Sequence, residues 1–328
     1  MGRDEFLSLI EGINVWRRGD SRAPHKPLLL LLALARVARG EARLAGYEAV
    51  VEDALTELLR RFGPPRVSHH PDQPFQRLPR DGLWEIRGLE TPGSARIEGR
   101  VPLRELRKME GGFPAPVHRL LRRNPQLVED AVRRILEGHF PASLHTDIRD
   151  AVGLPDYGTP LVEAWAGSAA AAGTLLRETP APVAGPPRSA TTPRDPRFRH
   201  RVLRAYERRC AVCGFDVRVE DQLLGLEAAH IKWHAAGGPD EVPNGLALCS
   251  FHHKALDVGA LGLEEAGESV AVLVSSEVNG QSAAVRHLLD FRGERLRPPR
   301  GRELAPAVEF VAWHRREVFR GPALSPRR

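Results

Sequence analysis

Four side chains in one short stretch of the chain have the types and spacing of a metal site. All three cysteines of the protein fall within forty residues of one another. Cys210 and Cys213 form a C-x-x-C pair, and Cys249 begins a C-x-x-H pair that ends at His252. Thiolate and imidazole donors at these spacings are the set that tetrahedral zinc prefers. We therefore predict a structural Zn²⁺ site held by these four residues.

Three further polar residues lie between and just after the zinc ligands. His230 ends the run EAAH, Asn244 lies in PNG, and His253 follows His252 directly. This order of histidine, asparagine and histidine resembles the HNH, or ββα-metal, endonuclease family. The resemblance implies a DNA endonuclease in which these three residues are catalytic.

The chemistry of each residue suits that role. Because an unperturbed histidine titrates near neutral pH, His230 can take a proton from the water that attacks phosphorus. A divalent cation, Mg²⁺ or Mn²⁺, would stabilise the charge of the transition state and the leaving oxygen. His253 is the first candidate ligand for this cation, and Asp257, one helical turn later, is the second. Asn244 is expected to hold its loop and orient His230.

One residue departs from the family pattern. Many HNH nucleases carry a metal ligand immediately before the general base, where this chain has Ala229, so Glu227 is a reserve candidate. A zinc ribbon without catalysis is the alternative for this half of the chain. It explains the cysteines and His252, but not the order of histidine, asparagine and histidine.

The flanking patterns predict the elements that position these residues. LLGLEAAH and LALC read as two strands and SFHHKALD as the start of a helix, which gives the ββα order. The preceding run DPRFRHRVLRAYERRC reads as a basic helix that meets DNA phosphates with some of its arginines. After the motif we expect strands in GALGLEE and SVAVLVSS, and a closing helix over 305–319 that buries Phe310, Trp313 and Val318.

The N-terminal half reads as mainly helical. Amphipathic spacing predicts helices over 4–16, 48–62 and 126–140, and a helix from Pro27 to Gly40 is apolar on every side and therefore buried. QPFQRLPRDGLWEIRG reads as two short strands joined at Asp81-Gly82. The fold class is therefore α+β, with a short hairpin in the helical N-terminal domain.

Basic residues gather at the expected start of the buried helix. Arg22, His25 and Lys26 lie in SRAPHKP, where free N–H groups and the helix dipole favour an anion such as phosphate. Capping and solvation of the helix end is the alternative reading. In HHPDQPFQRL, Pro74 and Phe75 lie beside Arg77. A loop that simply packs on the core is the alternative reading of this stretch.

Together, PHKPLLLLLAL and PFQRLPRDGLWEI resemble the sulfur-binding domains of phosphorothioation-dependent, McrA-like type IV restriction endonucleases, which are commonly fused to an HNH nuclease. The resemblance implies double-stranded DNA carrying phosphorothioate as the partner. Pro74 and Phe75 then form an apolar sulfur pocket, with Arg22, His25 and Lys26 on the phosphate backbone and Arg77 and Arg96 as further backbone contacts. Such a pocket would accept sulfur but leave a phosphate oxygen unpaired, a difference of about 1–3 kcal/mol. Gln73 departs from the family, which tends to have an aromatic residue there.

A composition shift divides the chain. Residues 167–193 are rich in Ala, Gly, Pro and Thr, as a solvated linker would be. We therefore expect a reader domain over 1–166 and a nuclease domain over 194–328. The net charge of +6 suits a polyanionic partner. Only four of the 48 basic residues are lysines, however, and a GC-rich genome produces the same skew, so the motifs carry the argument.

The remaining expectations concern location and rival functions. The start of the chain lacks a signal-peptide pattern, and the apolar run over 28–34 is too short for a bilayer, which indicates a cytoplasmic protein that does not bind membranes. A homodimer fits the sequence, but nothing in it decides the matter. One alternative is an HNH nuclease directed to a modified base such as methylcytosine, which needs a deep aromatic pocket that 6% aromatic content makes harder to build. Another is a non-catalytic, zinc-containing DNA-binding regulator.

Overall fold

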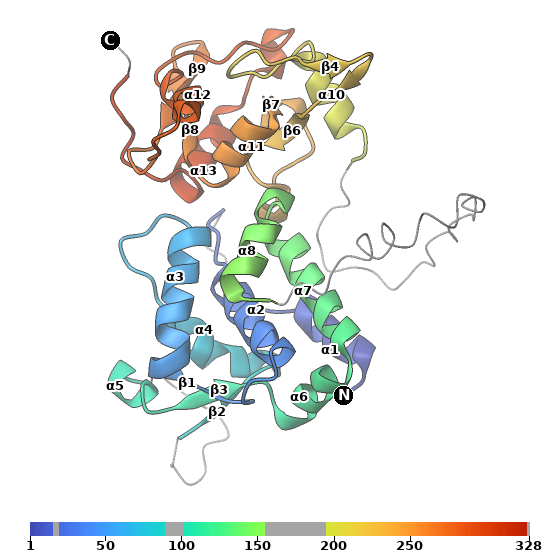
Figure 1. Ribbon diagram of the computed structural model, residues 1–328, viewed down its shortest axis with the longest axis vertical. Coiled ribbons are helices and arrows are strands. Elements are labelled where there is room, and N and C mark those ends of the chain that lie inside the picture. The colour runs from blue at the N-terminus through green and yellow to red at the C-terminus, as the bar shows by residue number, and fades with distance from the viewer. Residues whose placement is uncertain (16–19, 89–100, 155–194, 327–328) are drawn as a thin grey trace, which may run out of the picture.

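A computed structural model describes residues 1–15, 20–88, 101–154 and 195–326. The predicted linker over 167–193 and the candidate Arg96 lie outside these ranges. Figure 1 shows two parts, with the C-terminal part placed over the ends of α3 and α8 of the N-terminal part. Within the described residues, every helix is too short or too polar to cross a lipid bilayer.

The N-terminal part is built around one buried helix, α2 (His25–Ala38). Leucines over 28–32 are buried on all sides of it, which confirms the prediction for this segment. Helix α7 contacts both α2 and α1. Helices α3, α6 and α8 also contact α2. Their bounds are α1 (Arg3–Glu11), α3 (Asp53–Phe62), preceded by a π-helical turn (Tyr47–Glu52), α5 (Leu103–Leu106), α6 (Ala115–Arg123), α7 (Pro125–His139), a 3-10 turn (Ala142–Leu144) and α8 (His145–Val152).

The predicted hairpin is wrong in its first half. The segment QPFQRLPRD forms α4 (Asp72–Arg77) and a 3-10 turn (Leu78–Asp81), and Gly82 ends that turn with φ 73°. Prolines and an acidic first turn favour helix starts over a paired strand. The second half does form a strand, β2 (Glu85–Arg87). It joins β1 (Ala45–Gly46) and β3 (Glu110–Gly112) in a small antiparallel sheet of order β1-β3-β2.

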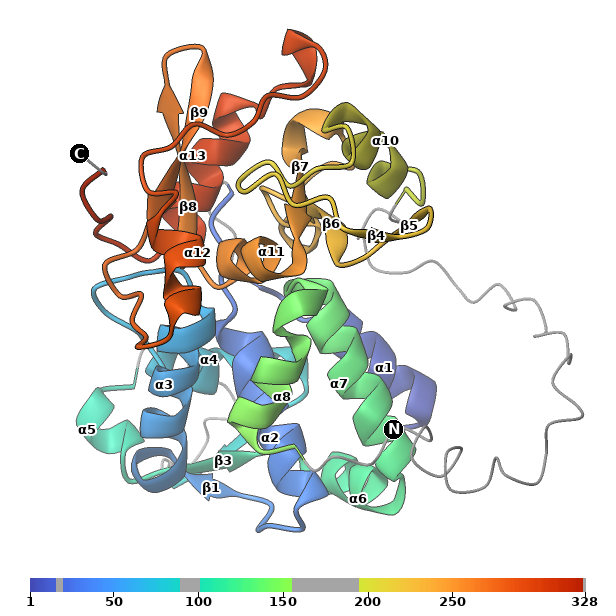
Figure 2. The same ribbon diagram turned by 45° about the horizontal axis from the view of Figure 1, so that its top comes forward.

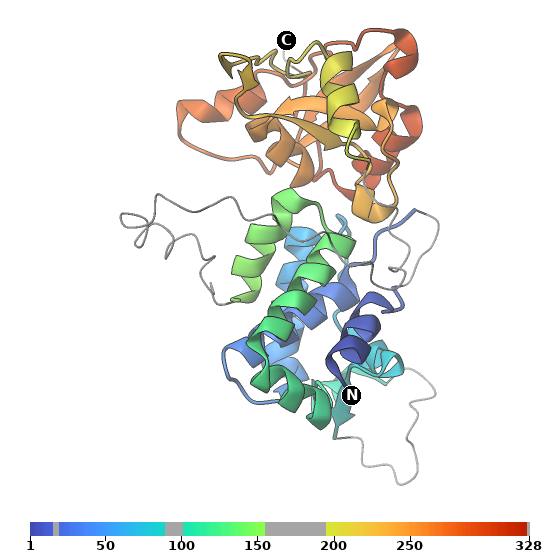
Figure 3. The ribbon, with the colours of Figure 1, turned by 90° about the vertical axis from the view of Figure 1, so that its right-hand side faces the viewer.

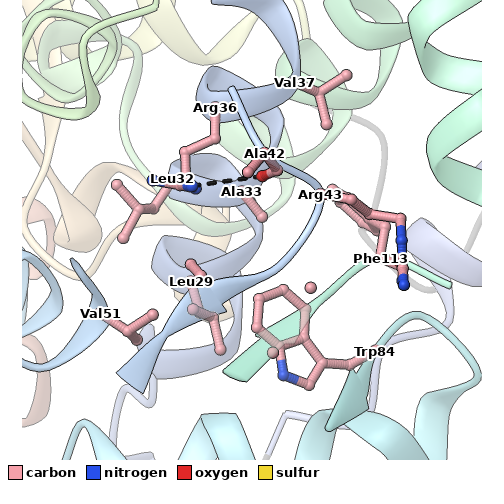
Figure 4. A pocket seen from close by; sticks show the side chains of 13 residues that line it. Leu29, Leu32, Ala33, Arg36, Val37, Ala42, Arg43, Val51, Trp84 and Phe113 are labelled. Carbon is pink, nitrogen blue, oxygen red and sulfur yellow. Dashed lines mark hydrogen bonds between the residues drawn. The ribbon is translucent and has the colours of Figure 1, made fainter. Parts of the chain in front are cut away.

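Aromatic rings fill the space between the helices and this sheet. Phe75 makes edge contacts with Tyr47 and Trp84, at centroid distances of 5.0 and 5.7 Å. A small, mainly apolar cavity lies beside these rings and is lined by residues that include Leu29 and Trp84. Figure 4 shows this cavity, with a hydrogen bond from the Arg36 guanidinium to the Ala42 carbonyl at its wall. Pro74 and Phe75 do not line this cavity, so it is not the predicted sulfur pocket.

The C-terminal part has the predicted ββα core. Strand β6 (Leu226–His230) pairs antiparallel with β7 (Gly245–Cys249), and α11 (Ser250–Asp257) follows at once. Helix α10 (Phe198–Ala205) contacts both strands. Strands β8 (Leu261–Ala266) and β9 (Ser269–Val274) form a second hairpin against α13 (Val308–Glu317), where Phe310, Trp313 and Val318 are buried as expected. Smaller elements are β4 (Arg218–Val219), β5 (Gln222–Leu223), α12 (Arg286–Leu289) and 3-10 turns at His234–Ala236, Val242–Asn244, Ala283–Val285 and Arg302–Leu304.

The two parts share a packed contact. Trp233 and Trp313 of the C-terminal part meet edge to face and join the hydrophobic cluster of the N-terminal part. Figures 2 and 3 show the contact from two sides, with the 3-10 turn before α8 directed at α11. Arg22 also joins the two parts, because its guanidinium donates to the Glu317 carbonyl and its backbone N–H donates to the Glu317 carboxylate.

Gly111 tests the aromatic packing. A Cβ at this position would lie 2.5 Å from the Phe75 ring and 2.7 Å from Trp84 Nε1. We expect Gly111→Ala to lower the free energy of unfolding by about 1–3 kcal/mol, the usual cost of overpacking. Gly138→Ala is the matched control, since its Cβ meets nothing within 4 Å and its helix gains up to about 1 kcal/mol. Thermal denaturation of both variants measures the difference, and equal midpoints would contradict the packing.

Candidate functional site

The four predicted zinc ligands come together in the structure. One ligand atom from each lies within 4.8 Å of all the others, as one tetrahedral ion requires. Among the described residues this is the one group of Cys, His, Asp or Glu side chains that satisfies that criterion. The four are Cys210, Cys213, Cys249 and His252.

Local geometry explains how the chain forms this cluster. The C-x-x-C segment is a tight turn, with the Gly214 N–H donating to the Cys210 carbonyl and Gly214 at φ 77°. Cys249 ends β7 and His252 lies at the start of α11. The position of β7 in its sheet therefore places both side chains beside the C-x-x-C turn. The other ring nitrogen of His252 bonds the His287 carbonyl at 2.7 Å, which fixes the ring. Hydrogen bonds from the Cys213 and Cys249 thiols lower the pKa of Cys210, which favours the thiolate that binds metal.

His230 lies at the end of β6, opposite Gly245. Its ring stacks on Phe198 of α10, with centroids 4.1 Å apart. Its Nε2 atom lies 2.7 Å from Oδ1 of Asp240, a residue that the sequence analysis did not single out. Burial alone would raise the pKa of Asp240, but hydrogen bonds from the Asp195 N–H and from His230 outweigh it and lower that pKa.

Asn244 is fully buried and holds the loop between the two strands. Its side chain accepts from the Lys232 N–H and donates to the carbonyls of Lys232 and Pro239. The loop passes so close that a Cβ on Gly238 would lie 1.8 Å from the Lys232 carbonyl oxygen. Asn244 therefore ties together the residues that follow His230 and precede Asp240.

His253 lies between two carboxylates. Its Nδ1 is 2.5 Å from Glu227 Oε2, and its Nε2 is 3.3 Å from Asp257 Oδ2. Glu227 and Ala229 share one face of β6, because side chains alternate along a strand. Glu227 therefore points to the same side of β6 as Ala229 and contacts His253 there. Imidazole and carboxylate are donors that suit Mg²⁺ or Mn²⁺. Because the two carboxylates contact different ring nitrogens, a cation bound at one nitrogen would meet the carboxylate on that side.

The N-terminal part covers one end of this group. Ser143, in the turn before α8, donates its hydroxyl hydrogen to the Asp257 carboxylate, and Lys254 pairs with Asp147 of α8 at 2.5 Å. The Asp257 side chain is 2% exposed, whereas that of Glu227 is 45% exposed. Burial raises the pKa of Asp257. In this arrangement Glu227 is the more accessible carboxylate of the two.

The structure separates the predicted phosphate contacts of the N-terminal part. Arg22 is partly buried, donates to the Glu317 carbonyl and lies over the Trp233 ring, and the desolvation of its guanidinium lowers its pKa to about 9. Lys26, at the start of α2, pairs with Asp81 at 2.5 Å. Burial lowers the pKa of His25 to about 4, with His70 and His69 adding to the effect, so His25 is neutral at pH 7.

The three candidates on α4 differ in exposure. Arg77 is exposed, Pro74 is buried, and the Phe75 side chain is wholly enclosed by the aromatic core. Helix α4 packs against α2, which places this segment beside the start of α2. Phe75 thus supports α4 from within the core in this structure, and its contact with sulfur stays a prediction.

Three neighbours of the candidate site escaped the sequence analysis. Asp240 lies in the loop PDEVPNG, where an acidic residue beside proline and glycine looks like an ordinary turn. Ser143 and Asp147 belong to the other domain, and no spacing relates them to α11. Only the register of β6 against β7 and the contact between the two parts reveal them.

The zinc cluster predicts a strong dependence of folding on Cys210. Cys210→Ser should lose bound zinc and the cooperative unfolding of the C-terminal part. Structural zinc contributes about 10–16 kcal/mol in zinc-finger peptides, as much as a whole domain's stability. Metal analysis and thermal denaturation check this, and a strong chelator acting on the unaltered protein should give the same loss. A folded, active Cys210→Ser protein without zinc would refute the assignment.

Comparison with protein families identifies both parts. Residues 3–157 match the model of the ScoMcrA-like, DNA sulfur-binding domain, and residues 210–264 match that of the HNH endonuclease. No curated protein matches the chain.

Solved structures with similarity include the sulfur-binding domain of SprMcrA complexed with phosphorothioated DNA. It is 29% identical, with a TM-score of 0.41 over 48% of this chain and 98% of that one. The corresponding domain of ScoMcrA is 24% identical, with a TM-score of 0.39 over 45% of this chain and 95% of that one. The type IV phosphorothioation-dependent restriction endonuclease ScoMcrA is also 24% identical, with a TM-score of 0.34, and the match covers 44% of this chain and 28% of that one. The chain thus joins a ScoMcrA-like DNA sulfur-binding domain at residues 3–157 to an HNH endonuclease domain at residues 210–264.

Proposed function

We propose that this chain is a restriction endonuclease that binds phosphorothioate-modified double-stranded DNA and hydrolyses a phosphodiester bond nearby. The observation that carries the proposal is the pairing of a sulfur-binding domain with an HNH domain whose His230, Asn244 and His253 all lie at the β6–β7–α11 unit. Two structures similar to the first domain are complexes with phosphorothioated DNA.

In the proposed reaction His230 is the general base. It takes a proton from water, the oxygen of that water attacks phosphorus, and the bond to the leaving oxygen breaks. Asn244 does not touch the reacting atoms in this scheme. It keeps the loop close to the strand end, through its bonds to Lys232 and Pro239.

His253 is the proposed ligand of the catalytic cation, with Glu227 and Asp257 as carboxylate partners. Both carboxylates contact the His253 ring, and Glu227 takes the place of the missing ligand at Ala229. When bound, Mg²⁺ or Mn²⁺ supplies charge stabilisation for the phosphorane and the leaving oxygen. The cluster of three cysteines and His252 holds the structural Zn²⁺.

The proposed sulfur contact lies at the start of α2 and on α4. Pro74 of α4 is the proposed apolar wall and is buried in this structure, so DNA would reach it only by displacing what covers it; His25 and Lys26 lie at the start of α2. Lys26 is paired with Asp81 in this structure, so a DNA phosphate would replace a carboxylate as its partner. Arg77 is the exposed basic residue of α4 and suits a backbone contact. Arg22 would contact DNA only after leaving Glu317.

His230→Ala should abolish strand cleavage while leaving DNA affinity nearly intact, because the base acts only in the transition state. The expected loss is about 10²–10⁴-fold in the single-turnover rate. Cleavage of a phosphorothioate duplex with Mg²⁺ or Mn²⁺, together with a gel shift under chelation, measures both quantities. Retention of the unaltered rate would exclude His230 as the base. Absence of metal-dependent cleavage in the unaltered protein would favour the regulator instead.

The sulfur preference should depend on Pro74. In the inactive His230→Ala background, Pro74→Ser should bring the affinities for phosphorothioate and ordinary duplexes together, since a polar wall solvates oxygen as readily as sulfur. Pro79→Ser, a proline of the following turn, is the matched control and should keep the preference. Lys26→Ala should weaken both duplexes alike and flatten the salt dependence.

Gel shifts at one salt concentration compare three duplexes of identical sequence: phosphorothioate, methylcytosine and unmodified. If the His230→Ala protein binds the phosphorothioate and unmodified duplexes with equal affinity, the sulfur proposal is rejected. Tighter binding of the methylated duplex would establish the modified-base alternative.

A further inference from the structure

We propose that Asp240 is a positioning residue that sets the tautomer and orientation of the His230 ring. The inference rests on the proposed role of His230 as general base. Nε2 of His230 lies 2.7 Å from Oδ1 of Asp240, which is hydrogen-bonding distance for a charge-assisted pair. Asp240 thereby assigns the ring proton to Nε2 and leaves Nδ1 as the nitrogen that takes the proton from water.

The carboxylate is itself held from several sides. Its second oxygen, Oδ2, accepts the Asp195 N–H at 2.5 Å, and the Asp240 carbonyl accepts from Arg201 of α10 at 2.6 Å. Its side chain is 12% exposed, so the pair with His230 is shielded from bulk water. A carboxylate fixed at both oxygens cannot rotate away from the imidazole without breaking another bond.

The ring is also fixed from its flat side. Phe198 stacks on His230 with an interplanar angle of 16°, and Gly245 leaves room for Phe198, since a Cβ there would lie 3.1 Å from that ring. Phe198 therefore defines the plane of the imidazole, and Asp240 defines its rotation within that plane.

Asn244 connects this pair to the strand ladder. It binds the carbonyl of Pro239, the residue before Asp240, and both backbone groups of Lys232, two residues after His230. The distance between the two chain segments is thus set by one buried amide. This explains how an asparagine remote from the reaction supports it, since Asn244 places the loop that carries Asp240.

The charge of Asp240 has a second effect. During the reaction His230 gains a proton and becomes an imidazolium, and an adjacent carboxylate stabilises that cation. His234 also faces Asp240, with its Nε2 4.0 Å from Oδ2, and Arg201 of α10 donates to the Asp240 carbonyl while pairing with the neighbouring Asp195 carboxylate. Two histidines thus face the Asp240 carboxylate, and His230 is the nearer of them.

The test uses the full chain and compares Asp240→Asn with Glu241→Gln. Asn keeps the shape of Asp240 but can donate to Nε2, which favours the wrong tautomer. Glu241 is exposed in the same loop, so Glu241→Gln makes the same change of charge away from His230. Asp240→Asn should lower the single-turnover cleavage rate about 10²-fold or more, within the range that a general base contributes. DNA affinity and zinc content should not change, and Glu241→Gln should stay within about twofold of the unaltered rate, the scatter expected for a surface substitution.

Two further readouts separate positioning from a structural role. Loss of the carboxylate lowers the pKa of His230, so the acid limb of the pH–rate profile should move to lower pH in Asp240→Asn. Nitrogen NMR of the His230 ring should show the proton on Nε2 in the unaltered protein and a shift toward Nδ1 in the variant. If Asp240→Asn keeps the unaltered cleavage rate and its pH–rate profile keeps the same acid limb, the inference is overturned.

Asp240→Glu covers the case in which the Asn variant does not fold. It restores a carboxylate one methylene further out, so an intermediate rate with a near-normal acid limb is expected. A rate no higher than that of His230→Ala would overturn the inference. His230→Ala runs in the same assay on plasmids with and without phosphorothioate. If the His230→Ala variant stays active, the proposed catalytic role of His230 is wrong. If His230→Ala is inactive while Asp240→Asn cleaves at the unaltered rate, only the proposed role of Asp240 is wrong.

Discussion

Five residue pairs join β6 to β7, from Leu226 opposite Cys249 to His230 opposite Gly245, and the functional side chains of the nuclease domain take their positions from this ladder. One end carries Cys249 of the cysteine and histidine cluster, and the other carries the candidate general base. Glu227 projects between them toward α11. Because side chains alternate along a strand, a slip of one residue would turn His230 to the opposite face and carry Glu227 away from His253. The cluster of three cysteines and His252 brings the turn at Cys210 to the same strand end, so a metal ion bound there would also stabilise this register.

The contact between the two domains depends on a different balance. Trp233, Trp313 and Val318 of the C-terminal part pack into the core of the sulfur-binding domain, and the partly buried Arg22 lies over the Trp233 ring. Its pKa of about 9 leaves it charged at neutral pH, and the nearby Glu317 carboxylate, which also pairs with Arg66 and Arg316, supplies opposite charge. Enclosed charges of this kind contribute little net stability, but losing Glu317 would leave Arg22 without an opposite charge in this contact. These charges therefore specify how the domains meet more than how tightly they bind.

Local patterns predicted most of the architecture. The apolar run after Pro27, the amphipathic spacing of α7 and the C-x-x-C and C-x-x-H pairs are all read within a few residues, and each is confirmed by an element or a cluster. The segment QPFQRL failed because alternation over six residues does not distinguish a strand from a short helix. Asp240, Ser143 and the burial of Arg22 depend on contacts between distant segments. No periodicity encodes such contacts.

The hydrogen bond from Ser143 to Asp257 links the two domains at a residue that a cation would also use. The hydroxyl occupies one lone pair of Oδ2, so a cation that approached Oδ2 from the same side would compete with Ser143 for it. Competition of this kind is reciprocal, because a partner that weakens the binding of another is weakened by the same factor in return. A cation bound to Asp257 would therefore weaken the contact between α11 and the turn before α8 that carries Ser143. Any DNA that draws the sulfur-binding domain away from α11 would raise the affinity of Asp257 for that cation in equal measure.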